Sequence, residues 1–129
     1  MVIDTSAIVA ILFDEPERDR FTRLIDDAGA RLVSAVGRVE AAFVVEGRRR
    51  EAGRERLDRF FRLTGAQIVG VTPEQAEIAI EAFRRFGKGR HPAALNIGDC
   101  FAYALAKATG EALLFKGTDF ARTDITAVA

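Results

Sequence analysis

Four acidic residues of this chain stand where a strand is expected to end or a helix to begin, and α/β proteins bind ligands at such places. The first is Asp4, which follows Val2 and Ile3. A Thr5-Ser6 pair and a long apolar run come next, an order typical of a buried strand that passes into a helix capped by Thr5 or Ser6. Asp4 is therefore a candidate site residue, and assistance to the helix cap is the alternative explanation.

Glu40 is the second candidate. Its face of an expected helix also carries Val36, Phe43 and Val44. An unpaired charge is costly to bury on an apolar face. Glu40 is therefore expected to pair with a cation, to bind a metal ion or to extend out of the interface into solvent. Glu46, by contrast, lies beside an arginine cluster and is expected at the surface.

Asp99 is the third candidate and stands three residues after Asn96. If Asn96 caps a helix, Asp99 occupies the position that completes a capping box. The same helix face carries Ala102, Tyr103 and Ala106 and is expected to pack inward. The carboxylate of Asp99 is thus placed either to serve the cap or to point into a site at the edge of the sheet.

Asp119, the fourth candidate, follows the last expected strand in a turn, where an Asp is by itself ordinary. Gathered at one edge, four carboxylates would repel one another unless a cation held them. A hard divalent ion such as Mg²⁺ suits this task, because it prefers oxygen ligands and keeps several waters while one or two carboxylates bind it directly. Such an ion activates water and neutralises charge that develops on a phosphate. Zinc is excluded, since one Cys and one His cannot supply its soft ligands.

The elements that must position these acids alternate between strands and helices. A chain of 129 residues has the size of one domain, which is expected to span residues 1–129. Strands are expected at 2–4, 31–35, 67–71 and 112–115, and helices from Pro16 to Gly29, from near Val36, from Thr72-Pro73 and from about Gly98. This alternation predicts an α/β fold with a parallel sheet covered by helices on both faces.

Positive charge is concentrated although the chain as a whole is balanced, with 19 basic and 19 acidic residues. Sixteen of the basic residues are Arg, whose planar side chain suits phosphate, and seven of them lie within residues 48–62. Lys88, Arg90 and His91 form a second group in a loop that two glycines and a proline predict over residues 86–92. Each group is either a solvated surface or a contact for a phosphate backbone.

Other sequence features narrow the class of protein. The single Cys100 excludes an internal disulfide and is expected to pack as a small hydrophobic residue. No apolar run approaches the roughly 20 residues of a membrane span, and the first segment lacks the pattern of a signal peptide. A soluble, cytoplasmic protein is expected.

Over its whole length the chain resembles the PIN-domain ribonucleases, and specifically the VapC toxins of bacterial toxin–antitoxin pairs. The resemblance rests on residues 2–6, on Glu15-Pro16, on Glu40 in the third helix, on the small-residue helix at 96–106 and on the terminal strand and acidic turn at 113–120. It implies a PIN-like three-layer sandwich whose central, mainly parallel sheet has four to five strands.

The resemblance also implies a function and roles for the acids. The protein would be a Mg²⁺- or Mn²⁺-dependent endoribonuclease toxin that cuts RNA of the tRNA or rRNA class by in-line attack of metal-activated water. Asp4 and Asp99 would be metal ligands, and Glu40 would complete or orient the water shell. Gly117 stands where the family commonly has an Asp. Either Asp119 takes over the role of that missing acid, or the site works with three acids.

Two partners follow from the same resemblance, a cognate VapB-type antitoxin that neutralises the toxin and a second copy in a homodimer. Five aromatic residues could line such surfaces or simply belong to the core: Phe43, Phe60, Phe61, Phe83 and Phe86. An alternative function is a catalytically weak or inactive PIN-like module that mainly binds its antitoxin or RNA. Phosphoryl transfer through an Asp nucleophile is disfavoured, because Ser6 stands where phosphatases of that type carry a second acid.

Overall fold

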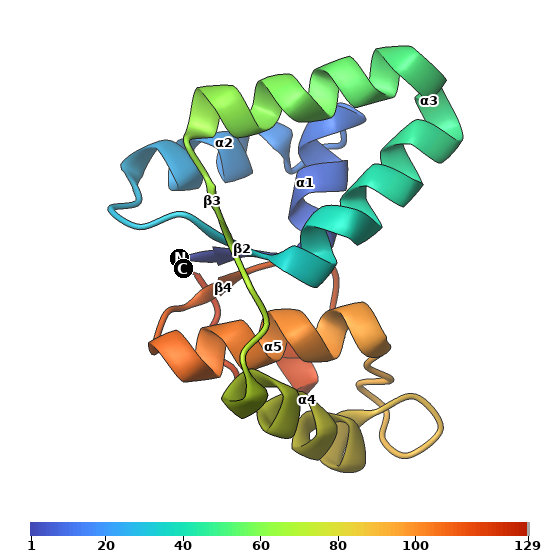
Figure 1. Cartoon of the computed structure of the whole chain (residues 1–129), viewed down its shortest axis with the longest axis vertical. Helices are drawn as coiled ribbons and strands as arrows, with labels where there is room; N and C mark the ends of the chain where they lie inside the picture. The colour runs from blue at the N-terminus through green and yellow to red at the C-terminus, as the bar shows by residue number, and fades with distance from the viewer. Residues whose placement is uncertain (129) are drawn as a thin grey trace.

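A four-stranded parallel sheet lies between two layers of helices in the computed structural model, which describes residues 1–128 (Figure 1). The strands run in the order β3-β2-β1-β4, with the bounds β1 (Val2–Ile3), β2 (Leu32–Ser34), β3 (Gln67–Val69) and β4 (Leu113–Leu114). One layer of helices contains α1 (Thr5–Leu12), α2 (Arg18–Asp27) and α3 (Ala35–Thr64), and the other contains α4 (Pro73–Phe86) and α5 (Ile97–Thr109). A short 3₁₀ helix follows at Phe120–Arg122. The expected three-layer architecture is confirmed.

The core consists of two apolar clusters, one on each face of the sheet, because successive strand residues point to opposite faces. Ile3 and Leu114 pack in the cluster beneath α1, α2 and α3, whereas Val2 and Leu113 pack in the cluster beneath α4 and α5. Burial on both faces explains why the strands are short runs of Val, Ile and Leu. Cys100 lies in the second cluster as the expected small hydrophobic residue, and burial raises the pKa of its thiol to about 11.

Helix α3 folds back on itself and forms a hairpin of two helical halves (Figure 1). The break is at Arg50, whose φ of 54° and ψ of −133° lie outside the helical region. Just after the break the two halves lie close together at Gly53, where a Cβ atom would lie 2.5 Å from the carbonyl oxygen of Val45. The sequence predicted the start of this helix but not its break, because no proline marks the turn.

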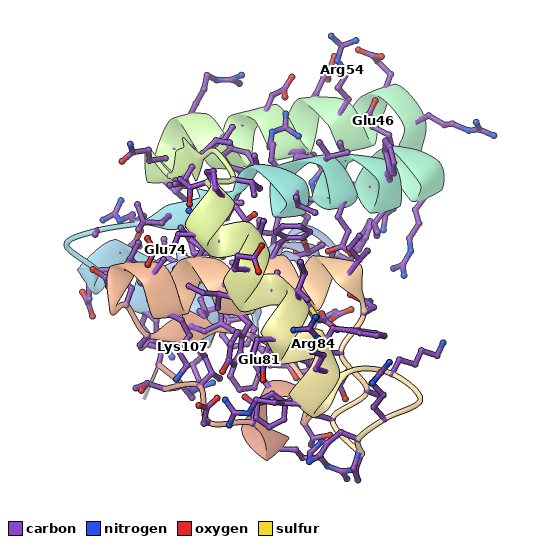
Figure 2. All side chains as sticks on the ribbon, turned by 60° about the horizontal axis from the view of Figure 1, so that its bottom comes forward. Glu46, Arg54, Glu74, Glu81, Arg84 and Lys107 are labelled. Carbon is purple, nitrogen blue, oxygen red and sulfur yellow. The ribbon has the colours of Figure 1, made fainter. Side chains whose placement is uncertain are left out.

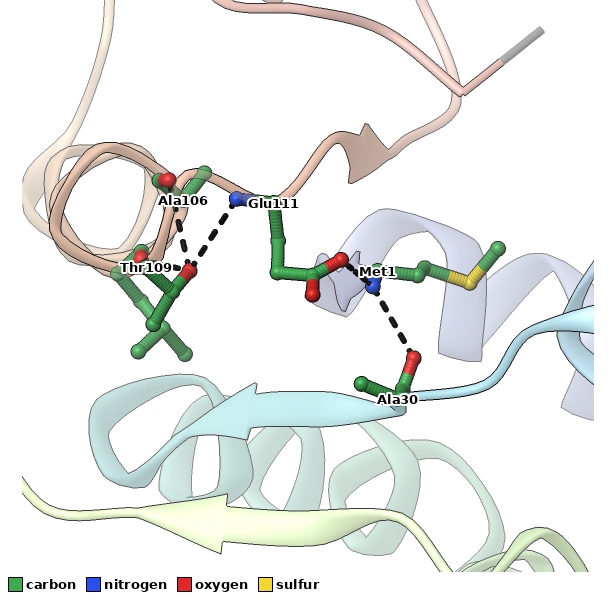
Figure 3. A network of polar contacts seen from close by, with 6 residues as sticks. Met1, Ala30, Ala106, Thr109 and Glu111 are labelled. Atoms are coloured by element: carbon green, nitrogen blue, oxygen red, sulfur yellow. Dashed lines mark hydrogen bonds and ion pairs between the residues drawn. The ribbon is translucent and has the colours of Figure 1, made fainter.

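The start of β1 is fastened to segments that lead into both neighbouring strands (Figure 3). The amino group of Met1 donates to the carbonyl oxygen of Ala30 at 3.0 Å, just before β2, and pairs with the carboxylate of Glu111, just before β4. At the end of α5 the Thr109 hydroxyl donates to the carbonyl oxygen of Leu105 at 2.7 Å. The two contacts of Met1 hold the amino ends of β1, β2 and β4 together, at the edge of the sheet opposite to the carboxyl ends.

The four expected strands are all present with slightly shorter bounds, and the second helix runs over Arg18–Asp27 instead of beginning at Pro16. Expected caps are also found, since the Thr72 hydroxyl accepts a hydrogen bond from the backbone N–H of Gln75 at 3.1 Å at the start of α4. Within residues 1–128, no helix has both the length and the apolar character that crossing a membrane requires.

Candidate active site

Asp4 lies just after β1, and only 4% of its surface is exposed. The residue itself caps α1, because its Oδ2 atom accepts a hydrogen bond from the backbone N–H of Ser6 at 3.0 Å. The prediction that Thr5 or Ser6 caps this helix is therefore wrong. The Ser6 hydroxyl donates a second hydrogen bond to the same oxygen at 2.6 Å. Burial raises the pKa of Asp4 to about 6, against the lowering effect of these two bonds.

Asp99 lies in the first turn of α5 and forms the expected capping box with Asn96. Its backbone N–H donates to Oδ1 of Asn96 at 2.9 Å, and its Oδ2 atom accepts from the backbone N–H of Asn96 at 3.0 Å. Burial raises the pKa of Asp99, although the hydrogen bond from Asn96 lowers it. The side chain thus serves the cap with one oxygen, while its environment makes the charge costly.

Glu40 projects from the first half of α3 toward the first turn of α5 and is half-buried. Its carboxylate lies directly against Gly98, so closely that a Cβ atom there would lie 2.2 Å from Oε2. Within residues 1–128 the Glu40 side chain has no ion pair. Of the three explanations for an acid on an apolar face, pairing with a cation of this chain is therefore not the one observed.

Asp119 is exposed in the turn after β4, just before the 3₁₀ helix. The turn is tied to the rest of the site by Lys116, whose backbone N–H donates to the Ser6 hydroxyl at 3.0 Å. The Lys116 ammonium binds Glu15 at 2.6 Å and Glu17 at 3.2 Å. Gly117 has a φ of 100°, a conformation that an Asp at this position would adopt only with strain.

The charges of the four acids act on one another. Asp99 and Glu40 both raise the pKa of Asp4, and Glu40 and Asp119 both raise the pKa of Asp99, in addition to the larger effect of burial. Carboxylates influence each other in this way when they are neighbours in a poorly solvated place. The fold thus brings the four acids that the sequence singled out to one place, where the carboxyl ends of the strands meet the start of α5.

These carboxylates form an open arrangement. Within residues 1–128, no three Asp, Glu, His or Cys side chains come close enough to enclose a metal ion by themselves. An ion that keeps several water molecules needs only one or two carboxylates as direct ligands. The donor set consists of oxygen atoms, which suits Mg²⁺ or Mn²⁺. A divalent cation would also offset the mutual repulsion of these charges and the cost of burying them.

The chain matches a known protein family. The family model of the PIN domain matches residues 1–125, nearly the whole chain. The chain belongs to the PIN domain family. Two curated relatives are the VapC ribonuclease Mb0640 of Mycobacterium bovis and the ribonuclease VapC30 of Mycobacterium tuberculosis. Each is 49% identical to this chain over 129 residues, and the match covers 100% of this chain and 98% of the relative. The ribonuclease VapC of Mycolicibacterium smegmatis is 48% identical over 128 residues, and the match covers 99% of each chain.

Solved structures share the fold of this PIN domain. The M. tuberculosis VapC20 structure, described as a sarcin-ricin loop cleaving toxin, superposes with a TM-score of 0.78 at 17% identity and covers 98% of this chain and 97% of that one. The Rickettsia felis VapBC2 structure, bound to a DNA fragment from its promoter, gives a TM-score of 0.76 at 15% identity, with 99% and 96% covered. At such identities these structures show the fold of the PIN domain alone.

The two cationic groups of the PIN domain lie in different places. The Arg-rich segment covers the bend and the returning half of the α3 hairpin, and Figure 2 labels one of its residues, Arg54. The second group lies in the loop between α4 and α5, which leads directly into the helix that carries Asp99. His91 serves this loop, since its Nδ1 atom accepts a hydrogen bond from the backbone N–H of Ala93 at 3.0 Å.

Three residues beside the acids were not foreseen. Ser6 links Asp4 to the turn after β4, Lys116 holds that turn against the α1–α2 loop, and Gly98 makes room for Glu40. The Asp-Thr-Ser order could have suggested Ser6, because a hydroxyl two residues after an N-cap Asp lies within reach of its carboxylate. No local pattern predicts the other two, because their contacts join segments far apart in the chain.

Proposed function

We propose that this PIN domain is a VapC-type endoribonuclease toxin, which hydrolyses RNA phosphodiester bonds with Mg²⁺ or Mn²⁺ and is neutralised by a cognate VapB-type antitoxin. The observation that carries the proposal is the gathering of four carboxylates, two of them with raised pKa values, at the carboxyl edge of the sheet. Relatives that match the chain from end to end at 49% identity and bear the name ribonuclease support the same activity here.

The way in which Asp4 and Asp99 are held supports the roles that the resemblance implies for the acids. Asp4 and Asp99 would hold the metal ion, and Glu40 would orient its water. Ser6 fixes the carboxylate of Asp4 and Asn96 fixes that of Asp99, so both ligands are in place before an ion arrives. An ion at this position supplies activated water and neutralises charge on the phosphate as the bond breaks.

The RNA would approach past the loop between α4 and α5. Arg90 lines a depression between these two helices. The Arg90 guanidinium suits a phosphate of the bound strand, because its planar fork matches phosphate oxygens. We propose structured RNA of the tRNA or rRNA class as the substrate.

The direct test is cleavage of a labelled structured RNA by the purified protein, free of antitoxin, with Mn²⁺ or Mg²⁺. Cleavage that requires the metal supports the nuclease. Absence of cleavage of tRNA and rRNA substrates, together with absence of stabilisation by Mn²⁺, would instead favour a PIN domain that only binds antitoxin or RNA.

Asp119→Asn tests whether this acid takes the role of the Asp that the family commonly has at the position of Gly117. Because Asp119 is exposed and its charge acts on Asp99, we expect cleavage to slow by about 10-fold, the scale on which groups around a metal site act. The rate of RNA cleavage at saturating Mn²⁺ is the measurement. Asp27→Asn, an exposed Asp at the end of α2, is the matched control, and equal rates for both variants would mean that the site works with three acids.

A groove lined by helices of the other layer fits the antitoxin. It has a volume of about 510 Å³ and lies between α1, α2 and the returning half of α3. Its floor is apolar, with Ile11, Ile25 and Phe60, and Arg18 and Arg59 stand on its sides. An amphipathic helix with acidic residues along its polar face would match both features. We propose that the VapB-type antitoxin docks there.

The homodimer would use a second apolar surface. Of the five Phe residues considered above, Phe60 and Phe86 are buried and Phe61 is half-buried, but Phe83 is 40% and Phe43 is 76% exposed. Phe43, Val39 and the 73% exposed Ile97 line one groove beside Glu40. An apolar surface of this kind typically marks an interface between proteins.

Phe43→Glu should therefore dissociate the dimer. A carboxylate in an apolar interface is expected to weaken self-association by about 30-fold or more, the effect of losing a central anchor. Sedimentation equilibrium of the wild type should give twice the chain mass of 14.1 kDa, and the variant should give the single mass. Leu63→Glu, 72% exposed in the proposed antitoxin groove, is the control that should stay dimeric. A wild type that sediments as a monomer would refute the homodimer.

A further inference from the structure

Gly98 occupies a special place in the first turn of α5. The residue is buried, and the three atoms nearest to a Cβ built on it all belong to the carboxyl group of Glu40, at 2.2, 2.6 and 2.7 Å. Its φ lies outside the left-handed region, so the backbone itself does not require glycine. The missing side chain makes room for the carboxylate of Glu40, the group that a Cβ atom would meet first.

Other tight glycines of the chain differ from Gly98 in this respect. At Gly53 and Gly87 a Cβ atom would lie within 2.5 Å of a backbone carbonyl oxygen, that of Val45 or Phe83, and these glycines allow parts of the fold to pack. The atoms that crowd Gly98 are the far end of a flexible side chain, which can rotate away without moving the backbone. A side chain at position 98 would thus displace Glu40 and leave the fold intact.

We propose that Gly98 is a positioning residue for Glu40. Because Gly98 has no side chain, the Glu40 carboxylate can lie against the amino end of α5, beside Asp99. The inference rests on the proposed function, in which Glu40 orients the water of a metal ion bound by Asp4 and Asp99. The amino end of a helix carries partial positive charge, so it favours the carboxylate in this place. Gly98 therefore gives Glu40, which makes no ion pair in the described part of the chain, a defined position next to the other acids.

Gly98→Ala separates this role from a structural one. The added methyl group would occupy the position of the carboxylate, and we expect cleavage and Mn²⁺ affinity each to fall by about 10-fold or more. The melting temperature of the metal-free protein should stay the same or rise, because Ala is a better helix former than Gly. A glycine that mattered only for packing would give a lower melting temperature instead.

A compensating variant sharpens the test. Glu40→Asp shortens the side chain by one methylene group, so the double variant Gly98→Ala/Glu40→Asp has room for both the new methyl group and the carboxylate. We expect the two substitutions to be non-additive, with the double variant losing clearly less activity than the product of the two single losses. Gly47→Ala is the matched control, since Gly47 is exposed in α3 with no atom within 4 Å of its Cβ position.

The experiment compares Mn²⁺ affinity by calorimetry, cleavage of labelled tRNA and metal-free melting temperature for these variants, each first shown to have the wild-type mass in solution. Weaker Mn²⁺ binding by Gly98→Ala at an unchanged or higher melting temperature supports the inference. Wild-type affinity and cleavage, or a lowered melting temperature, would overturn it. If the wild type cleaves no RNA, the proposed function fails. Mn²⁺ affinity then decides the role of Gly98 alone, and equal affinities would refute it.

Discussion

Asp99→Asn should slow metal-dependent RNA cleavage by at least about 100-fold, as expected when a charge that acts on the transition state is removed. The substitution removes the negative charge that would bind the metal ion. It keeps the fold, because the amide oxygen can still accept the hydrogen bond from the backbone N–H of Asn96 that Oδ2 accepts at 3.0 Å. Single-turnover cleavage of a labelled RNA at saturating Mn²⁺ measures the effect.

The control for Asp99→Asn is Asp27→Asn, which removes an exposed carboxylate at the end of α2, outside the group of four acids, and should leave the rate unchanged. Circular dichroism of both variants should match that of the wild type. A rate within about 3-fold of the wild type for Asp99→Asn would mean that this carboxylate binds no catalytic ion, since a mutational effect that small is under 1 kcal/mol.

Asp4→Asn should stabilise the metal-free protein while it abolishes cleavage. Burial raises the pKa of Asp4 from 3.8 to about 6, so at neutral pH the folded protein holds a charge that the unfolded chain keeps at much lower cost. A pKa shift of this size lowers the free energy of unfolding at neutral pH by about 3 kcal/mol at most. The amide of Asn can still cap α1, because Asn and Asp are similarly good N-cap residues.

The pH dependence of stability follows with a definite sign. Between about pH 4 and pH 6 the folded state binds more protons at Asp4 than the unfolded state does, so the wild type loses stability as the pH rises through this window. The stability gained by Asp4→Asn should therefore be absent below pH 4 and reach its full value above pH 6. Urea unfolding of both proteins without metal, from pH 3.5 to pH 7.5, measures this difference.

Addition of Mn²⁺ at pH 7.5 provides the counterpart of this experiment. The ion should stabilise the wild type, because it binds the folded state alone. It should leave Asp4→Asn almost unchanged. A constant difference between the two proteins at all pH values, or equal stabilisation of both by Mn²⁺, would contradict the view that the ionised Asp4 is held in the site at a cost that a metal offsets.

Local patterns predicted the strands and the positions of Asp4 and Asp99 in the fold, for reasons that can be stated residue by residue. Val2 and Ile3 are apolar because helices cover both faces of the sheet, and Asn96 and Asp99 form a capping box because their spacing is set within one helical turn. Asp4 was assigned a place at the end of β1 by the switch from strand to helix. All of these signals act within a few residues of each other.

What the sequence did not reveal depends on contacts between distant segments. The break of α3 at Arg50 places the returning half of the helix against α1 and α2, and no proline announces it. The exposure of Phe43 depends on which face of α3 meets the sheet. The fit of Glu40 into the space at Gly98 joins residues 58 positions apart, so neither residue's neighbours could have indicated it.

One measurement tests most directly whether these acids hold a divalent ion for the hydrolysis of RNA by water. The purified protein, freed of antitoxin, is incubated with an end-labelled tRNA in EDTA and then with excess Mn²⁺, and the new RNA ends are identified. We predict no cleavage in EDTA, rapid cleavage after Mn²⁺ addition and products without a 2′,3′-cyclic phosphate, because water attacks the phosphorus atom. Cleavage that persists in EDTA would contradict a metal-dependent reaction, and products that end in a cyclic phosphate would contradict attack by water.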